Sequence, residues 1–246
     1  MGLEHVESDE AAAAVTLLKR AQPHAPGAQA VVWDNILRGV HINQILTEVG
    51  IVPIVGVHAK KNPEGGEGRR AGRYVPKTAD TDTVTVRLPD GAETMIHLSA
   101  CDGALSRKQL TETGEPHYEP LPLTRLQRNP NKQGFRWYGS YKLPGSLGGK
   151  EISVRHHQNA EDDKRGLNRT ENLRPIPESS PDFERLRVLR PDAESINRGI
   201  EDSLFLNRAS AKGWRRQMVD LLGHARLVNA LTLARCRARL PVEAVA

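Results

Sequence analysis

The chain has 246 residues, enough for one large domain or for one domain that carries a sizeable insertion. Lysine and arginine outnumber aspartate and glutamate by 35 to 30, and the pI of about 9.4 favours a polyanionic partner. The two cysteines, Cys101 and Cys236, are too few for a disulfide framework or a cysteine-rich zinc site. No apolar stretch reaches the ~18 residues of a membrane span, and the first residues lack an apolar signal core, so we expect a cytosolic (cytoplasmic) protein.

The first block, residues 1–60, alternates helix and strand. Short continuous apolar runs are typical of buried strands, whereas apolar residues at helical spacing, ended by a glycine, indicate a helix. In chain order the pattern predicts a helix over 9–20, a strand over 28–33 that ends at Asp34, a helix over 42–49 that ends at Gly50, and a strand over 51–57. A strand, a helix and a strand with short joints form a βαβ unit, which should cross over right-handed.

The second block, residues 61–180, holds most of the glycines and prolines and is expected to be a β-rich insertion with long loops. Residues 83–88 and 93–98 alternate polar and apolar around Pro89-Asp90-Gly91, which predicts a hairpin. A second hairpin is predicted from 121–128 and 135–142 around a loop at 129–134, and residues 152–156 add a strand.

The third block, residues 181–246, is expected to be helical. Two sets of apolar residues fall at helical spacing, and basic residues accompany both sets. The first set is Ala193, Ile196, Ile200, Leu204 and Leu206; the second is Met218, Leu221, Leu222, Ala225, Val228, Leu231 and Leu233.

Two acidic residues stand where chemistry is expected. Asp34 directly follows a predicted strand, and functional groups collect at the carboxyl ends of strands in α/β sheets, although a helix cap or turn explains an aspartate there too. Glu194 lies in the first turn of a predicted helix, where the helix dipole already favours a carboxylate. Together they supply part of a two-metal site for phosphoryl transfer, for which Mg²⁺ is the suitable ion.

The sequence around these acids resembles DDE insertion-sequence transposases over nearly the whole chain. Residues 31–53 are similar to the strand that bears the second acid and the helix after it. The similarity continues in the run 168–177, in 183–186, in 193–198 around Glu194, and in 207–209 and 229–231. The best agreement is with an actinobacterial group that has an RNase H-like core and a β-rich insertion between the second acid and the glutamate.

The resemblance implies that Asp34 and Glu194 are the second and third metal ligands, with Mg²⁺ as cofactor. It also implies cleavage and transfer of double-stranded DNA at the ends of an insertion sequence, and a homodimer that bridges two ends. Arg190 would contact DNA phosphate, and so would Arg198, one turn from Glu194. The sequence departs from the family signature at both flanks, because Arg187 replaces a tyrosine and Glu201 replaces a lysine.

The first aspartate of the family lies on a three-stranded meander, for which the residues before the first predicted helix are too few. The fold expected is therefore α/β (α+β): a partial RNase H-like core that lacks its first three strands, a β-rich insertion and C-terminal helices. We expect this polypeptide to bind metal poorly, not to cleave DNA alone, and to have an exposed sheet edge. Two alternatives stay open: a non-catalytic DNA-binding remnant of a truncated insertion sequence, and a nuclease with Asp102 or Asp192 as its third acid.

Other residues have simpler interpretations. His156 and His157 are adjacent in a predicted strand and point to opposite faces, so they make a poor metal pair, and a surface or loop position is expected. Trp137, Tyr138 and Tyr141 stand near basic residues and could stack on unpaired bases, but packing in the hairpin core is the expected role.

Overall fold

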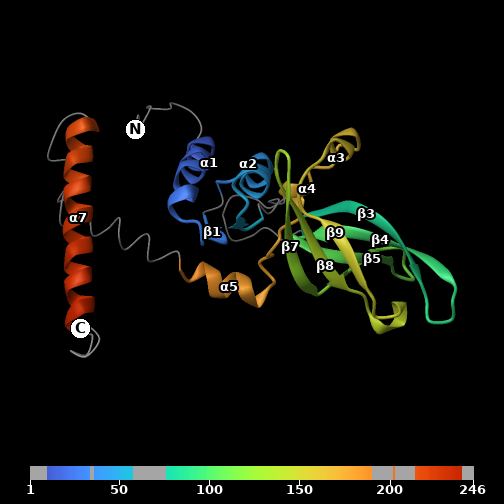
Figure 1. Ribbon diagram of the computed structural model, residues 1–246. Helices are drawn as coiled ribbons and strands as arrows, with labels where there is room; N and C mark the ends of the chain where they lie inside the picture. Colours follow the sequence, from blue (N-terminus) through green and yellow to red (C-terminus); the bar gives the residue numbers. More distant parts are fainter. Residues whose placement is uncertain (1–9, 34–35, 58–75, 190–201, 203–213, 240–246) are drawn as a thin grey trace, which may run out of the picture. The chain divides into compact units, whose positions relative to one another are not determined.

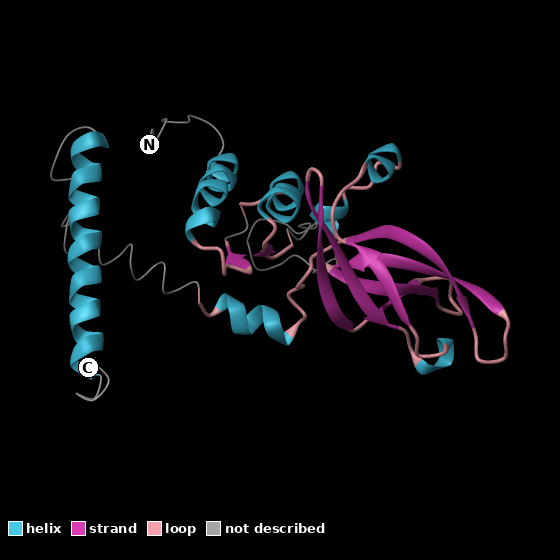
Figure 2. Cartoon of the chain, viewed as in Figure 1, coloured by secondary structure: helices cyan, strands magenta, loops and turns pink. Residues whose placement is uncertain are grey.

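The computed structural model describes residues 10–33, 36–57, 76–189, 202 and 214–239, and it combines helices and strands as an α+β protein does (Figures 1 and 2). The chain divides into two compact units, residues 1–188 and 189–246, which are described separately. In the described ranges, no helix is both long enough and apolar enough to cross a membrane.

The predicted strand–helix–strand unit is confirmed. Strand β1 (Ala30–Val32) pairs in parallel with β2 (Val52–Ile54), and helix α2 (Gly39–Gln44) lies between them in the sequence. Helix α2 continues into one π-helical turn, η2 (Ile45–Val49), and Gly50 ends it in the left-handed conformation that glycine adopts readily. Both strands are shorter than predicted, because only three residues of each form the parallel ladder.

Helix α1 (Glu10–Ala21) and the short helix η1 (Gln22–His24) precede this unit, in agreement with the predicted first helix. The apolar side of α1 is formed by Ala11, Ala14 and Val15. It is buried in a core that α1 shares with α2, η2 and β2. Trp137 from the β-rich region joins the same core, and its indole Nε1 donates a hydrogen bond to the Leu46 carbonyl oxygen at 2.7 Å. The β-rich region and the βαβ unit therefore share one core.

The β-rich region contains two antiparallel sheets. The first has the strand order β3-β4-β5-β6, and the second has the order β7-β8-β9. Their bounds are β3 Thr78–Arg87, β4 Glu93–Cys101, β5 Ala104–Leu110, β6 Pro116–Pro120, β7 Leu123–Asn131, β8 Gly134–Lys142 and β9 Glu151–Arg155, with a 3-10 turn η3 at Gly145–Leu147. Side chains from both sheets, among them Leu98, Leu105, Tyr141 and Val154, form a second apolar core.

Both predicted hairpins and the strand before His156 are confirmed, with three differences. Strand β3 begins at Thr78, five residues before the predicted start, because polar residues pair with β4 around a bulge near Asp80. Strands β5 and β6 were not predicted, since β5 has few apolar residues and prolines begin and end β6. The β7–β8 hairpin turns over residues 132–133 instead of a longer loop.

Three short helices follow β9: α3 (Ala160–Lys164), α4 (Arg169–Asn172) and α5 (Pro181–Arg187). Asparagine or serine caps each of them through a side-chain oxygen that accepts a backbone N–H. Phe183 of α5 is buried in the first core.

In the second unit the structure describes Asp202 and helix α7 (Trp214–Arg239), as the predicted helical C-terminal block requires. The apolar residues of α7 are distributed around the helix, and Val219, Leu222, Leu227, Val228, Leu231 and Leu233 are all exposed. The expected single apolar stripe is therefore not present as a buried face. The other predicted stripe, from Ala193 to Leu206, lies outside the described residues.

Candidate functional site at the carboxyl end of β2

All four residues that the sequence proposed for the site lie outside the described residues: Asp34, Arg190, Glu194 and Arg198. The structure does describe the strand that leads to Asp34. The backbone N–H of Trp33 donates to the Ile54 carbonyl oxygen at 3.2 Å, so pairing with β2 extends one residue past β1. The segment from Val55 to Val57 continues β2 beyond Ile54, which is the partner of the residue before Asp34 in the sequence.

The guanidinium of Arg174 is buried at this end of β2. It donates hydrogen bonds to the carbonyl oxygens of Val55 at 3.2 Å and Gly56 at 3.3 Å, and also to that of Thr170. Burial lowers the pKa of Arg174 to about 10, an effect that the carboxylates of Glu171 and Glu178 partly offset. Arg174 therefore stays charged at neutral pH and places a positive charge, with no ion-pair partner among the described residues, at the end of the strand.

Glu171 fixes the start of α2 to the same region. Its carboxylate accepts the Gly39 backbone N–H at 2.5 Å and pairs with the Lys77 ammonium at 3.1 Å. Burial alone raises the pKa of Glu171, but the Gly39 hydrogen bond and Lys77 outweigh burial and hold this pKa below its usual value. A Cβ on Gly39 would lie 2.5 Å from the Asn168 side chain, so a glycine is required at this contact.

The β4–β5 turn lies against the end of β2. Asp102 adopts a φ of 49°, which is unusual for a residue other than glycine, and its carboxylate accepts the Lys77 backbone N–H at 2.9 Å. The next residue, Gly103, accepts the Arg174 N–H at 2.9 Å. Beside this turn is a cavity of about 470 Å³, whose lining includes Val57, Asp102 and Glu178. The β-rich region thus contributes polar groups next to the βαβ unit.

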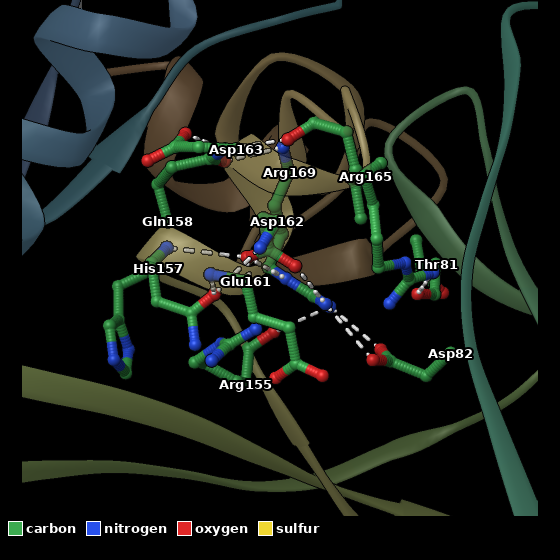
Figure 3. Close-up of polar contacts among 12 residues, drawn as sticks. Thr81, Asp82, Arg155, His157, Gln158, Glu161, Asp162, Asp163, Arg165 and Arg169 are labelled. Atoms are coloured by element: carbon green, nitrogen blue, oxygen red, sulfur yellow. Dashed lines mark hydrogen bonds and ion pairs between the residues drawn. The ribbon is translucent and has the colours of Figure 1, made fainter.

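Arg169 forms the most deeply buried ion pairs among the described residues (Figure 3). Its guanidinium binds Asp162 through Nε at 3.0 Å and Nη2 at 2.8 Å, and it binds Asp82 of β3 at 2.7 Å and 3.0 Å. Arg169 and Asp162 are fully buried, and Arg155 makes a second contact with Asp162 at 3.0 Å. Burial alone lowers the pKa of Arg169, but the two carboxylates outweigh burial and raise it.

The run 168–174 therefore connects three parts of the unit. Thr170 donates to the Gly39 carbonyl oxygen at 2.7 Å, Glu171 binds the N–H of the same glycine, Arg169 binds the β-rich region, and Arg174 binds the end of β2. The sequence singled out this run by resemblance but gave it no role. The charged residues of this run were the one signal in the sequence that could have indicated a role for it. The burial of Arg169 and Arg174 cannot be predicted from the sequence.

Two of the simpler interpretations require correction or refinement. His156 and His157 lie in the loop that follows β9, as predicted, but not at the surface, since they are 0 % and 7 % exposed. Hydrogen bonds from the His156 N–H to the Trp137 carbonyl oxygen and between its ring and the Tyr141 hydroxyl hold this loop against β8. Trp137 and Tyr141 pack in the two cores as predicted, whereas Tyr138 is only half-buried and contacts the His157 ring edge-on at 5.6 Å.

In the described ranges, no group of three or more His, Cys, Asp or Glu side chains is arranged to hold a metal ion. The described charges at the end of β2 are mixed: Arg174 and Lys77 are positive, and the carboxylates are those of Asp102, Glu171 and Glu178. No protein-family model matches this sequence, and comparisons with curated proteins and with solved structures give no match either.

Proposed function

We propose that the chain is the catalytic region of a DDE-type transposase with an RNase H-like core, which acts on double-stranded DNA at the ends of an insertion sequence. The parallel pair β1–β2 carries the proposal: pairing runs through Trp33, and the next residue in the sequence is Asp34. Functional groups of open α/β sheets gather at the carboxyl ends of parallel strands. Asp34 thus occupies the sequence position that a metal-binding aspartate of this fold requires.

The β-rich region supports the same proposal. Strands β3 to β9 all fall between Asp34 and Glu194 in the sequence, as in transposases that carry an insertion between the second acid and the glutamate. The run 168–174 ties this insertion to the end of β2 through Arg169 and Arg174. The chain therefore leaves the insertion close to the βαβ unit before it continues toward Glu194.

We assign Asp34 and Glu194 as ligands of Mg²⁺, and Arg190 and Arg198 as contacts to DNA phosphates. Carboxylate oxygens are the hard donors that Mg²⁺ prefers, and the ion would neutralise charge at the phosphate and activate the attacking oxygen. The family uses a third carboxylate, so we expect weak metal binding and no DNA cleavage by this polypeptide alone. Arg174 adds positive charge at the end of β2, which stabilises a carboxylate or phosphate held nearby.

DNA binding and Mn²⁺ binding test the proposal together. Fluorescence anisotropy of a labelled duplex should show binding that weakens as salt rises, and Arg190→Gln and Arg198→Gln should each reduce the log–log salt slope by about 0.9. The control is Arg185→Gln, an exposed arginine paired with Asp182 on α5. In electron paramagnetic resonance titrations, weak Mn²⁺ binding should be lost in Asp34→Asn and in Glu194→Gln but retained in Asp182→Asn.

The other possible results contradict the proposal or favour one of its two alternatives. A chain that does not bind duplex DNA at low salt contradicts the proposal. DNA binding without any effect of Asp34→Asn on Mn²⁺ would indicate a non-catalytic DNA-binding remnant. Mg²⁺-dependent cleavage by this polypeptide that Asp102→Asn abolishes would indicate the nuclease alternative instead.

A further inference from the structure

A polar cleft of about 590 Å³ opens between η2, the β7–β8 turn and the residues after β9. Its volume is in the range of small-ligand sites. Its lining includes Asn43, Asn131, Arg136, Arg155, His157 and Asn159. Glu48 is the one carboxylate among the described lining residues, and the Lys19 ammonium pairs with it. The cleft is separate from the carboxyl end of β2 and its polar groups.

Three asparagine side chains that line the cleft use their amide oxygens as acceptors. The amide oxygens of Asn43 and Asn131 accept the backbone N–H groups of Gln158 at 2.9 Å and Gln133 at 2.8 Å. The amide oxygen of Asn159 accepts two N–H groups in the first turn of α3. Since these bonds fix which end of each amide is oxygen, each NH₂ group is the other end, and no acceptor among the described residues binds it.

Positive charge in the cleft is not fully balanced. Arg155 and Arg169 carry two positive charges, and Asp162 and Asp82 carry two negative charges that pair with them. Arg136 is exposed, and its guanidinium forms no ion pair or hydrogen bond within the described part of the chain. The Nε of Arg155 is buried and has no described partner either. The cleft therefore has an excess positive charge and unused N–H donors.

His157 also lines the cleft. Its Nδ1 lies 3.1 Å from the Trp137 backbone nitrogen and 3.2 Å from the Trp137 carbonyl oxygen, so it accepts from the first or donates to the second according to the tautomer of the ring. Burial, together with the charges of Arg155 and Arg136, lowers the pKa of His157, which keeps the ring neutral.

We propose that this cleft binds a phosphate group of a DNA strand, with Arg136 as its charged contact and the asparagine NH₂ groups as neutral donors. A phosphate has several acceptor oxygens and no donor, so it complements a cleft that offers donors and positive charge. The inference rests on the proposed DNA-binding function and adds a contact remote from Asp34. Free phosphorylated molecules share this chemistry, and the experiment separates them from DNA.

The test compares Arg136→Gln with Arg125→Gln in the same duplex-binding assay. Arg125 is an exposed arginine on β7, outside the cleft, with no ion pair among the described residues, so both variants lose one charge. We expect Arg136→Gln to weaken binding roughly three- to tenfold at ~0.1 M salt and to lower the salt slope by about 0.9, with little change for Arg125→Gln. Equal behaviour of the two variants would overturn the inference and leave the proposed function standing.

A second measurement does not require DNA binding. Pyrophosphate titrated into the ¹⁵N-labelled chain should shift the side-chain NH₂ signals of Asn43, Asn131 and Asn159, and Arg136→Gln should weaken the shifts. If the chain does not bind DNA but these signals shift, the proposed function fails and the ligand is a free phosphorylated molecule, which overturns the assignment to DNA. If neither DNA nor pyrophosphate has an effect, the phosphate site itself is overturned.

Discussion

Replacement of Arg169 by methionine tests whether the run 168–174 holds the first unit together. The guanidinium of Arg169 makes five hydrogen bonds: two to Asp162, two to Asp82 and one to the Arg155 carbonyl oxygen. Methionine fills much of the volume but leaves the carboxylate of Asp162 fully buried, with Arg155 as its one remaining charged partner among the described residues. Loss of one member of a buried ion pair costs about 3–5 kcal/mol, so we expect a loss of that size.

The measurement is urea unfolding monitored by the fluorescence of Trp33 and Trp137, which both belong to the first unit. Trp214 is replaced by phenylalanine in all variants, because it belongs to the second unit. The control is Arg185→Met, which removes a pair of the same type from the surface, where the side chains of Arg185 and Asp182 are 73 % and 60 % exposed. That change should cost less than about 1 kcal/mol.

A double variant separates charge burial from packing. Burial by itself raises the pKa of Asp162, but the hydrogen bonds and charge of Arg169 outweigh burial and hold this pKa below its usual value. Asp162→Asn in the Arg169→Met background removes the stranded charge, and it should recover roughly 1–3 kcal/mol. If Arg169→Met costs no more than the Arg185 control, or if the double variant is less stable than the single variant, the argument from a buried ion pair is wrong.

Two further predictions concern stability. Burial lowers the pKa of His156 to about 3, below the unfolded value of 6.5, so the unfolded state binds more protons between these values and stability falls as pH falls from 6.5 toward 3. His156→Gln should reduce the dependence of the unfolding free energy on pH between 4 and 6 by up to about 1.4 kcal/mol per pH unit. An unchanged slope in this variant contradicts the prediction. Gly134→Ala should lower the free energy of unfolding by about 1–3 kcal/mol or more, because φ is +134° and the added Cβ would lie 2.1 Å from the Thr47 carbonyl oxygen. The control is Gly145→Ala, because a Cβ added at Gly145 meets no atom within 4 Å. In urea unfolding the control should lose almost no stability, and equal stability of the two alanine variants would refute the reasoning.

The elements that the sequence predicted are those with a strong local signal. The apolar runs at β1 and β2 and the alternation in β4 and β8 reflect burial of one or both strand faces, and Gly50 ends the helix at the predicted residue. Strands β5 and β6 have no such signal: β5 pairs with β4 and contributes Leu105 to the second core, and β6 pairs with β5. Local sequence cannot encode a partner that lies elsewhere in the chain.

In the candidate site, too, the sequence predicts residues that depend on local features but not residues that depend on distant contacts. Asp34 could be proposed because it follows an apolar run, and a strand end is a local feature. The roles of Arg169 and Arg174 depend on acceptors distant in the sequence: Asp82 for the first and the carbonyl oxygens of Val55 and Gly56 for the second. An arginine in a polar run is most often exposed, so the sequence alone favours a surface position for both.

These contacts have a consequence for how the βαβ unit is held. A two-stranded parallel sheet leaves one edge of each strand unpaired within the sheet, and such a small sheet does not maintain its geometry alone. Trp137 of β8 fills the core beside η2, whereas Glu171 of α4 binds the start of α2 and Arg174 binds the end of β2. The β-rich region and the run 168–174 together therefore fix the carboxyl end of β2, and deletion of residues 76–174 should unfold the βαβ unit instead of leaving an independent core.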